Sequence, residues 1–172
     1  MGQLERLPSI SFIKSQIEIR QASPTDNPLE LLDLARRNVE EVAQPGIEFD
    51  EKCVIESFAR IACSSHPRSV NLFLASVGDK LIGFLVGELR QSLFNHTFSG
   101  YQDIVWVDPG WRGSRAAILL FKAFEEWFIT GEAVDIFIGS AHVRPEQVRR
   151  FGKLGKHLGY QTVGIHQRKA LK

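Results

Sequence analysis

DIVWVDPGWRGSRAA, residues 103–117, is the stretch of sequence that decides the fold. Its first five residues have the composition of a buried strand, and Asp-Pro-Gly at 108–110 ends that strand. A strongly apolar helix is predicted directly afterwards, from Ala116 to Phe128. A buried strand that leads through a short loop into an apolar helix indicates a layered α/β protein.

The hydrophobic pattern on either side of this stretch predicts an alternation of strands and helices. Residues 91–100 are polar and are predicted to form a loop. The other expected elements are a strand at 17–20, helices from 28 to the Pro45-Gly46 break and at 51–62, a hairpin at 70–77 and 81–88, a strand at 134–138, a helix from 145, and a closing strand pair at 160–165 and 167–171. This order predicts an α/β fold with a partly antiparallel sheet.

Length and composition exclude several classes of protein. The chain has 172 residues, of which 44% are hydrophobic and 24% charged, as expected of one ordinary globular domain. It contains no run of about 18 apolar residues, and its first residues lack the pattern of a secretory signal. Cys53 and Cys63 lack zinc-site spacing, so we expect two reduced thiols, no metal site and a cytoplasmic protein.

The charge is unevenly distributed. Residues 140–172 hold eight Lys and Arg side chains against one acidic side chain, although the net charge of the whole chain is only +1. Such asymmetry suits a nucleic-acid-binding module. The simpler interpretation is the solvated face of a last helix, and no aromatic or nucleic-acid motif accompanies the basic residues. We therefore rank nucleic-acid binding last.

The loop at 108–115 has the chemistry of an anion cradle. Backbone N–H groups at a helix start point outward, the helix dipole favours negative charge, and Gly113 permits close approach. Arg112 and Arg115 add donors suited to phosphate. The sequence is neither a Walker loop nor a dinucleotide fingerprint. The alternative is an ordinary strand-to-helix turn with two exposed arginines.

VDPGWRGSRAA at 107–117 resembles the acetyl-CoA pyrophosphate loop of the GNAT superfamily of N-acetyltransferases. Three further segments resemble the family in its own order: IEIRQA at 17–22, LIGF at 81–84 and LGY at 158–160. The resemblance implies a GNAT-like α/β fold, with a central mixed sheet of six to seven strands flanked by about four helices. It covers one domain at 17–172, preceded by an extension at 1–16.

The resemblance also implies where acetyl-CoA binds as co-substrate. Arg115 stands where the family usually has glycine. The end of the strand would pair with the pantetheine arm through its backbone, so side-chain identity matters little there. The implied cofactor-binding residues are Val105, Trp106 and Val107 on the strand and Arg112, Gly113, Ser114, Arg115, Ala116 and Ala117 in the loop and helix start.

The catalytic residues are less clearly marked. Many members have a tyrosine five residues before the aromatic residue of the Leu-Gly-Phe motif, and Gly155 stands there. Asp103 has the parity of Val105 and Val107, and it resembles the base carboxylate of several members. His142 and Glu88 are the second and third candidates for the base.

The resulting hypothesis is an acetyl-CoA-dependent N-acetyltransferase that acts on a primary amine of a small molecule or protein. Five carboxylates near the expected acceptor side would attract cationic amines such as polyamines, lysine side chains or aminoglycosides, unless they form only a solvated surface: Glu40, Glu41, Glu48, Asp50 and Glu51. A non-catalytic domain that binds CoA or a partner is the alternative. A homodimer and a monomer both remain open, and no membrane association is expected.

Overall fold

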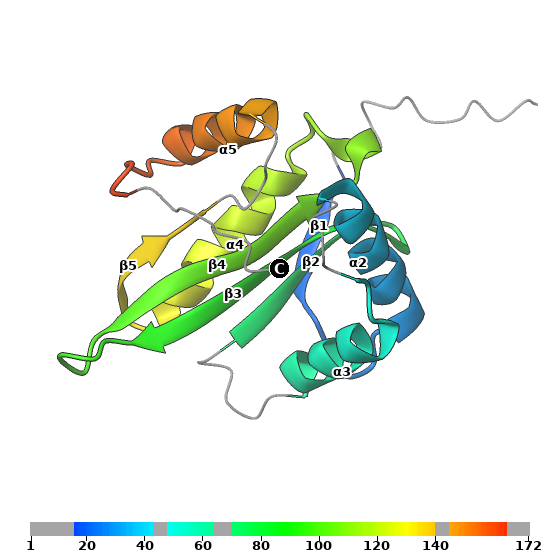
Figure 1. The fold of residues 1–172 in the computed structure, drawn as a ribbon, viewed down its shortest axis with the longest axis horizontal. Helices are drawn as coiled ribbons and strands as arrows, with labels where there is room; N and C mark the ends of the chain where they lie inside the picture. The colour runs from blue at the N-terminus through cyan, green and yellow to red at the C-terminus, as the bar shows by residue number, and fades with distance from the viewer. Residues whose placement is uncertain (1–15, 43–47, 64–69, 140–144, 165–172) are drawn as a thin grey trace, which may run out of the picture.

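The computed structural model describes residues 16–42, 48–63, 70–139 and 145–164. Within these ranges the chain forms a mixed sheet of five strands in the order β1-β2-β3-β4-β5 (Figure 1). The strands are β1 (Glu18–Gln21), β2 (Val70–Val77), β3 (Lys80–Gln91), β4 (Phe98–Val107) and β5 (Ala133–Phe137). Neighbouring strands from β1 to β4 are antiparallel, and β5 lies parallel to β4.

Helices cover both faces of the sheet. They are α2 (Pro28–Val42), α3 (Glu51–Ala62), α4 (Ala116–Thr130) and α5 (Pro145–His157). The helices α2 and α3 pack on one face, against β3 and β2, whereas α4 crosses all five strands on the other face. Figure 1 shows α5 beside α4, and its Phe151 and Leu154 pack on the core that α4 forms with the sheet. The predicted α/β class is confirmed.

Local chemistry explains where the first helices begin. The side chain of Asn27 accepts a hydrogen bond of 3.0 Å from Leu29 N–H, and Pro28 takes the first helical position of α2. Asp50 caps α3 by accepting from Cys53 N–H at 3.0 Å. Both helices therefore satisfy N–H groups that a helix start leaves without partners.

Two glycines let α4 lie close to the sheet. A Cβ atom on Gly87 would lie 2.5 Å from the ring of Phe124, and one on Gly100 would lie 2.6 Å from the ring of Phe128. Both rings are fully buried. Because these two strand positions carry no side chain, the aromatic face of α4 packs directly on β3 and β4, and this packing holds the loop before α4 against the end of β4.

Three details of the fold differ from the sequence-based expectations. The hairpin arm at 91–100 is largely strand, because β3 runs to Gln91 and β4 begins at Phe98, with Ser92 N–H bonded to Thr97 O at 2.9 Å. The helical spacing that Leu29 shares with Leu32 and Ala35 predicts that it packs inward, but its side chain is exposed. Residues 160–164 form no strand, so the described sheet has five strands instead of six or seven; the predicted strand at 167–171 lies outside the described residues.

No helix in the described ranges is long and apolar enough to cross a bilayer. Within the same ranges no group of three or more His, Cys, Asp or Glu side chains is placed to hold a metal ion. Both cysteines are free thiols, and both are exposed.

Candidate active site

The loop that the sequence predicts to be an anion cradle lies between β4 and α4. A short 3-10 turn at Pro109–Trp111 begins it, and the carboxylate of Asp108 stabilises this turn by accepting from Gly110 N–H at 2.8 Å. Gly113 follows with a φ of +81°, a backbone conformation that favours glycine. A Cβ atom at Gly113 would have no other atom within 4 Å, so the space in front of this backbone is open.

The start of α4 faces the same space. Arg115 occupies the N-cap position, and an arginine side chain has no acceptor for the N–H groups of the first turn. Ser114 Oγ accepts from Ala116 N–H at 3.2 Å, Ala116 is buried, and Ala117 packs on the core. The first turn of α4 therefore combines outward N–H groups, the positive end of the helix dipole and the exposed Arg115.

Next to the loop, β4 has an edge that no strand of the described residues covers. Its pairing with β5 ends at Tyr101 and Phe137, whereas its pairing with β3 continues to Val107. Asp108 N–H donates to Ile82 O at 2.9 Å, on the β3 side. Because backbone groups of a strand alternate between its two edges, those of Val105 and Val107 face away from β3. The backbone of Trp106 faces β3, and its side chain extends toward α2.

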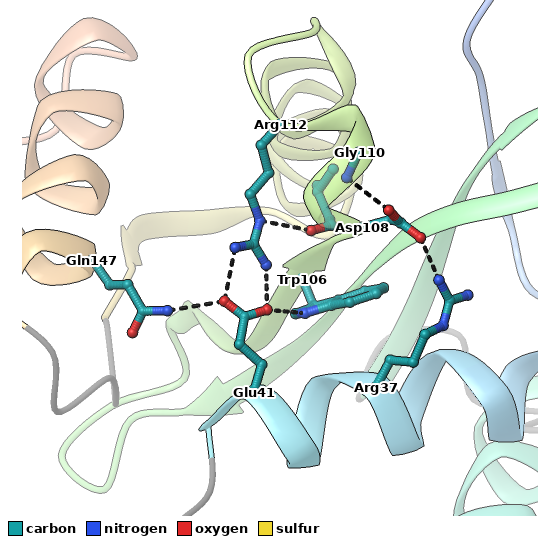
Figure 2. Close-up of polar contacts among 8 residues, drawn as sticks. Arg37, Glu41, Trp106, Asp108, Gly110, Arg112 and Gln147 are labelled. Atoms are coloured by element: carbon teal, nitrogen blue, oxygen red, sulfur yellow. Dashed lines mark hydrogen bonds and ion pairs between the residues drawn. The ribbon is translucent and has the colours of Figure 1, made fainter.

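A carboxylate from α2 reaches across to this loop. Figure 2 shows Glu41 between the loop, the end of β4 and the first turn of α5. Its Oε1 accepts from Arg112 Nη1 at 2.7 Å and from Gln147 Nε2 at 2.9 Å. Its Oε2 accepts from Arg112 Nη2 and from Trp106 Nε1, the latter at 2.9 Å. Glu41 thus connects four parts of the fold.

This pairing changes the expected role of Arg112. Its Nε donates to Val107 O at 3.0 Å, and both of its Nη atoms donate to Glu41. In this arrangement the guanidinium braces the loop against β4 and α2 instead of pointing into the cradle. The sequence interpretation missed Glu41 as the partner because 71 residues separate the two side chains.

A second ion pair joins the same helix to the same loop. Arg37, one turn before Glu41, pairs with the carboxylate of Asp108, and its guanidinium lies 5.4 Å from the ring centroid of Trp106 (Figure 2). The two pairs have opposite polarity, since α2 provides a cation and then an anion. This arrangement aligns α2 with both ends of the loop.

The five carboxylates of the predicted acceptor wall are not one cluster of equivalent charges. Glu41 is occupied by the contacts above, Asp50 caps α3, and Glu51 pairs with Arg36. Glu40 and Glu48 are exposed. Three of the five therefore have structural partners, which reduces the negative potential expected from this region.

Asp103 lies where β4 leaves β5. The β3–β4 register shifts at Gly87, so that Val86 opposes Ile104 while Gly87 opposes Gln102, and Asp103 is the extra residue of a bulge. The predicted common face of Asp103, Val105 and Val107 is wrong for this reason. Val105 and Val107 pack on the α4 side, whereas Asp103 contacts Arg90 on the opposite side.

The groups around Asp103 shift the pKa of its carboxyl group. Partial burial raises the pKa of its carboxyl group, the guanidinium of Arg90 lowers it, and the carboxylate of Glu88 raises it; the net result is a raised pKa. Arg90 Nη2 lies 3.2 Å from Asp103 Oδ1. Arg90 was not identified from the sequence, although Glu88 and Arg90 share the parity of one strand face.

The remaining candidates lie in different settings. Glu88 is paired with Arg90, and His142 lies outside the described residues. Tyr160 packs in the core against Phe121, with ring centroids 6.5 Å apart, and burial raises the pKa of its phenol far above the usual range. Of the three proposed bases, the structure therefore brings Asp103 and Glu88 together.

Comparison with solved structures identifies the fold. An aminoglycoside acetyltransferase from an uncultured soil metagenomic sample, in complex with trehalose, has a TM-score of 0.71 at 16% identity, covering 93% of this chain and 99% of that one. AAC(6')-Iy in complex with a CoA-containing bisubstrate analogue has a TM-score of 0.68 at 18% identity, covering 90% and 98%.

A ribosomal-protein-alanine N-acetyltransferase from Brucella melitensis biovar Abortus 2308 matches equally well. Its TM-score is 0.68 at 15% identity, covering 91% of this chain and 99% of that one. The sequence matches no protein-family model and no curated protein. At these identities the likeness concerns the fold, and the chain has the fold of the GNAT acetyltransferases.

Proposed function

We propose that this chain, with its GNAT fold, is an acetyl-CoA-dependent N-acetyltransferase that acts on a primary amine. The observation that carries the proposal is the open edge of β4 between Asp103 and Val107, which leads into the cradle loop. This edge offers strand backbone for a peptide-like arm, with the N–H groups at the start of α4 beyond one end for phosphate and the carboxylate of Asp103 at the other end.

The residues present fit the co-substrate, which supplies the acetyl group as a reactive thioester. Val105 offers a backbone donor and acceptor on the open edge, and Val107 offers its N–H, since Val107 O already accepts from Arg112. The N–H groups at the start of α4 offer an anion site with Arg115 beside it. Arg112 shapes the site indirectly, by bracing Val107 O and Glu41. Asp103 and Val107 are four positions apart, a span of roughly 13 Å along a strand.

Asp103 is proposed as the base. It accepts, through a water molecule, the proton that an ammonium group must lose before its nitrogen attacks the thioester. The new bond is the amide C–N bond, the broken bond is C–S, and the leaving thiolate takes up the second proton that the attacking nitrogen loses. Because Asp103 faces the α2 and α3 side of the sheet, the amine approaches from that side.

Cationic amines are the proposed acceptors. Two carboxylates, Glu88 and Asp103, lie together on the face of β3 and β4 where the pairing of β4 with β5 ends, and Glu40 of α2 and Glu48, just before α3, are exposed. The aminoglycoside acetyltransferase of this fold that was solved with trehalose was also solved in complex with sisomicin. An aminoglycoside is therefore the first acceptor class to test, followed by polyamines and lysine side chains.

The test is thiol release from acetyl-CoA with a panel of these amines. We expect Asp103→Asn to lower turnover roughly a hundredfold while acetyl-CoA affinity changes little, because the cofactor is held by backbone groups elsewhere. Asp79→Asn, in the exposed β2–β3 turn, is the matched control and should keep full turnover. Full activity of the Asp103 variant would shift the role to Glu88 or His142.

One observation favours a second candidate, a non-catalytic domain that binds CoA or a partner. Gly155 stands where many GNAT enzymes have a tyrosine, and a Cβ atom there would lie 3.2 Å from Ile138 Cδ1. The buried α5 position therefore leaves little room for a larger side chain. Tight acetyl-CoA binding without thiol release from any amine would support this candidate.

A further inference from the structure

Four polar or aromatic side chains gather on one face of β3 and β4, where β4 leaves β5. Arg90 lies at the centre of this cluster, which also contains Glu88, Tyr101 and Asp103. Its Nε donates to Glu88 Oε2 at 2.7 Å, and its Nη2 donates to Asp103 Oδ1 at 3.2 Å. Its guanidinium lies 4.5 Å from the ring centroid of Tyr101, which in turn stacks on Phe137 of β5 at 5.1 Å.

The fold itself gains little from this cluster. The side chains of Arg90, Asp103 and Glu88 are 50%, 37% and 32% exposed. Ion pairs as exposed as these contribute about 0–1 kcal/mol to stability. The contacts do, however, restrict Arg90 from two sides, since the aromatic ring supports one plane of the guanidinium and Glu88 holds its edge.

The bulge explains why Arg90 reaches Asp103. Without the extra residue, Asp103 would follow the alternation of Val105 and point to the α4 side of the sheet. With it, Asp103 lies on the face of Glu88 and Arg90, at the position where the pairing of β4 with β5 has just ended. The bulge and Arg90 together define where the carboxylate stands.

We infer that Arg90 is a positioning residue, which holds the carboxylate of Asp103 at the point where β4 leaves β5. This inference deepens the proposed function, because it assigns the support of the proposed base. Two influences work against the charged form of Asp103, namely burial and the neighbouring Glu88, and Arg90 is the cation that opposes them.

The charged and titratable groups around Asp103 come from three strands. From β3 the charged neighbours of Asp103 are Glu88 and Arg90, and from β4 the titratable neighbour is Tyr101. From β5, Asp135 opposes Ser99, which is also the partner of Arg90 across the β3–β4 pair. On this face of the sheet, α2 packs against β3 and α3 packs against β2.

The direct test is an NMR titration of the Asp103 carboxyl carbon, assigned with Asp103→Asn. In Arg90→Gln the midpoint should rise by about one pH unit, because one opposite charge within hydrogen-bond distance is lost. Arg90→Lys should restore most of the wild-type midpoint, since it keeps the charge. Arg60→Gln, an exposed arginine of α3, is the matched control and should leave the midpoint unchanged.

The second readout is the pH dependence of thiol release with the best amine. The acidic limb of kcat/KM should move upward with the NMR midpoint in Arg90→Gln and return in Arg90→Lys, while KM for acetyl-CoA stays within about twofold. An unchanged midpoint in Arg90→Gln would overturn the inference. If the NMR midpoint of Asp103 shifted in Arg90→Gln but the acidic limb of kcat/KM did not move, the role of Arg90 in the reaction would be overturned.

Failure of the proposed function is distinguishable from failure of this inference. Full turnover in Asp103→Asn, or no turnover in the wild-type protein, would remove Asp103 from the chemistry. The NMR midpoint in Arg90→Gln is measured without turnover, so it decides the contact between Arg90 and Asp103 in either case. Because the pair is exposed, circular dichroism should show both Arg90 variants folded.

Discussion

Glu41 of α2 and Arg112 of the cradle loop form a two-point ion pair that joins residues 71 positions apart in the chain. The side chain of Glu41 is 18% exposed, and its two oxygens also accept from Gln147 and Trp106. Few carboxylates near a protein surface have so many donors. The pair therefore couples the loop to α2 and α5 more firmly than an isolated surface pair would.

We expect Glu41→Ala to lower the free energy of unfolding by about 1–3 kcal/mol, because three donors lose a partly buried acceptor. The double variant Glu41→Ala/Arg112→Ala should lose less than the sum of the single variants, with a coupling energy of about 0.5–3 kcal/mol. Urea denaturation of the four proteins measures this. Glu40→Ala, the exposed neighbour, is the control; strictly additive losses would contradict a direct pair.

Acetyl-CoA should raise the melting temperature of the wild-type protein, since a ligand of the folded state adds roughly 2.7 kcal/mol at a hundredfold excess over Kd. Gly113→Glu should abolish this rise by placing a side chain and a negative charge in front of the open backbone. Differential scanning fluorimetry checks both proteins.

Gly78→Glu is the matched control for that experiment. Gly78 also has a positive φ, +55°, and also has no atom within 4 Å of its Cβ position. Its substitution introduces the same backbone strain and charge at the far β2–β3 turn. The ligand-induced rise should survive there, and an equal loss in both variants would mean that the loop has been assigned wrongly.

The pairing of Asp26 with Arg20 makes stability depend on pH. Hydrogen bonding to Arg20 lowers the pKa of Asp26, and its bond from Ser23 N–H at 2.6 Å acts in the same direction. A depressed folded-state pKa stabilises the fold above the unfolded pKa of about 4, and this contribution is lost as pH falls below that value. Asp26→Asn should therefore lower the melting temperature at pH 7 by a few degrees, for a loss of about 1 kcal/mol.

The same substitution should have a smaller effect near pH 3, because there the carboxyl group of Asp26 is protonated in the unfolded chain and folding must release that proton. Melting curves at both pH values show the difference, and Asp79→Asn in the exposed turn should show none. If Asp26→Asn lowered the melting temperature equally at pH 7 and pH 3, the loss of stability would come from packing and not from charge.

The exposed basic face of α5 makes a weak, unspecific nucleic-acid interaction the expected outcome. Four of its side chains are exposed: Arg149, Arg150, Lys153 and Lys156. If all four neutralised phosphates of duplex DNA, affinity should fall by roughly two orders of magnitude between 50 and 200 mM salt. Fluorescence anisotropy measures this, and sequence-selective binding that survives 200 mM salt would promote the nucleic-acid hypothesis.

The sequence alone predicted most of the helices and strands, because their signals are local. The hairpin around Gly78, the helical spacing of α3 and the apolar run of α4 are each encoded within about a dozen neighbouring residues, and the structure places them where the periodicity indicated. The position of the cradle loop could also be predicted from the sequence, because a strand end, a glycine and a helix start follow one another along the chain.

Relations between distant segments required the tertiary structure. Arg112 looked like a phosphate ligand until α2 brought Glu41 to it, and the face of Asp103 depended on a bulge, which is a property of two paired strands and not of one. Strand parity holds only while the register is regular, and one extra residue sends the side chain to the other face. Hydrophobic periodicity determines which elements form, whereas packing decides which charges meet.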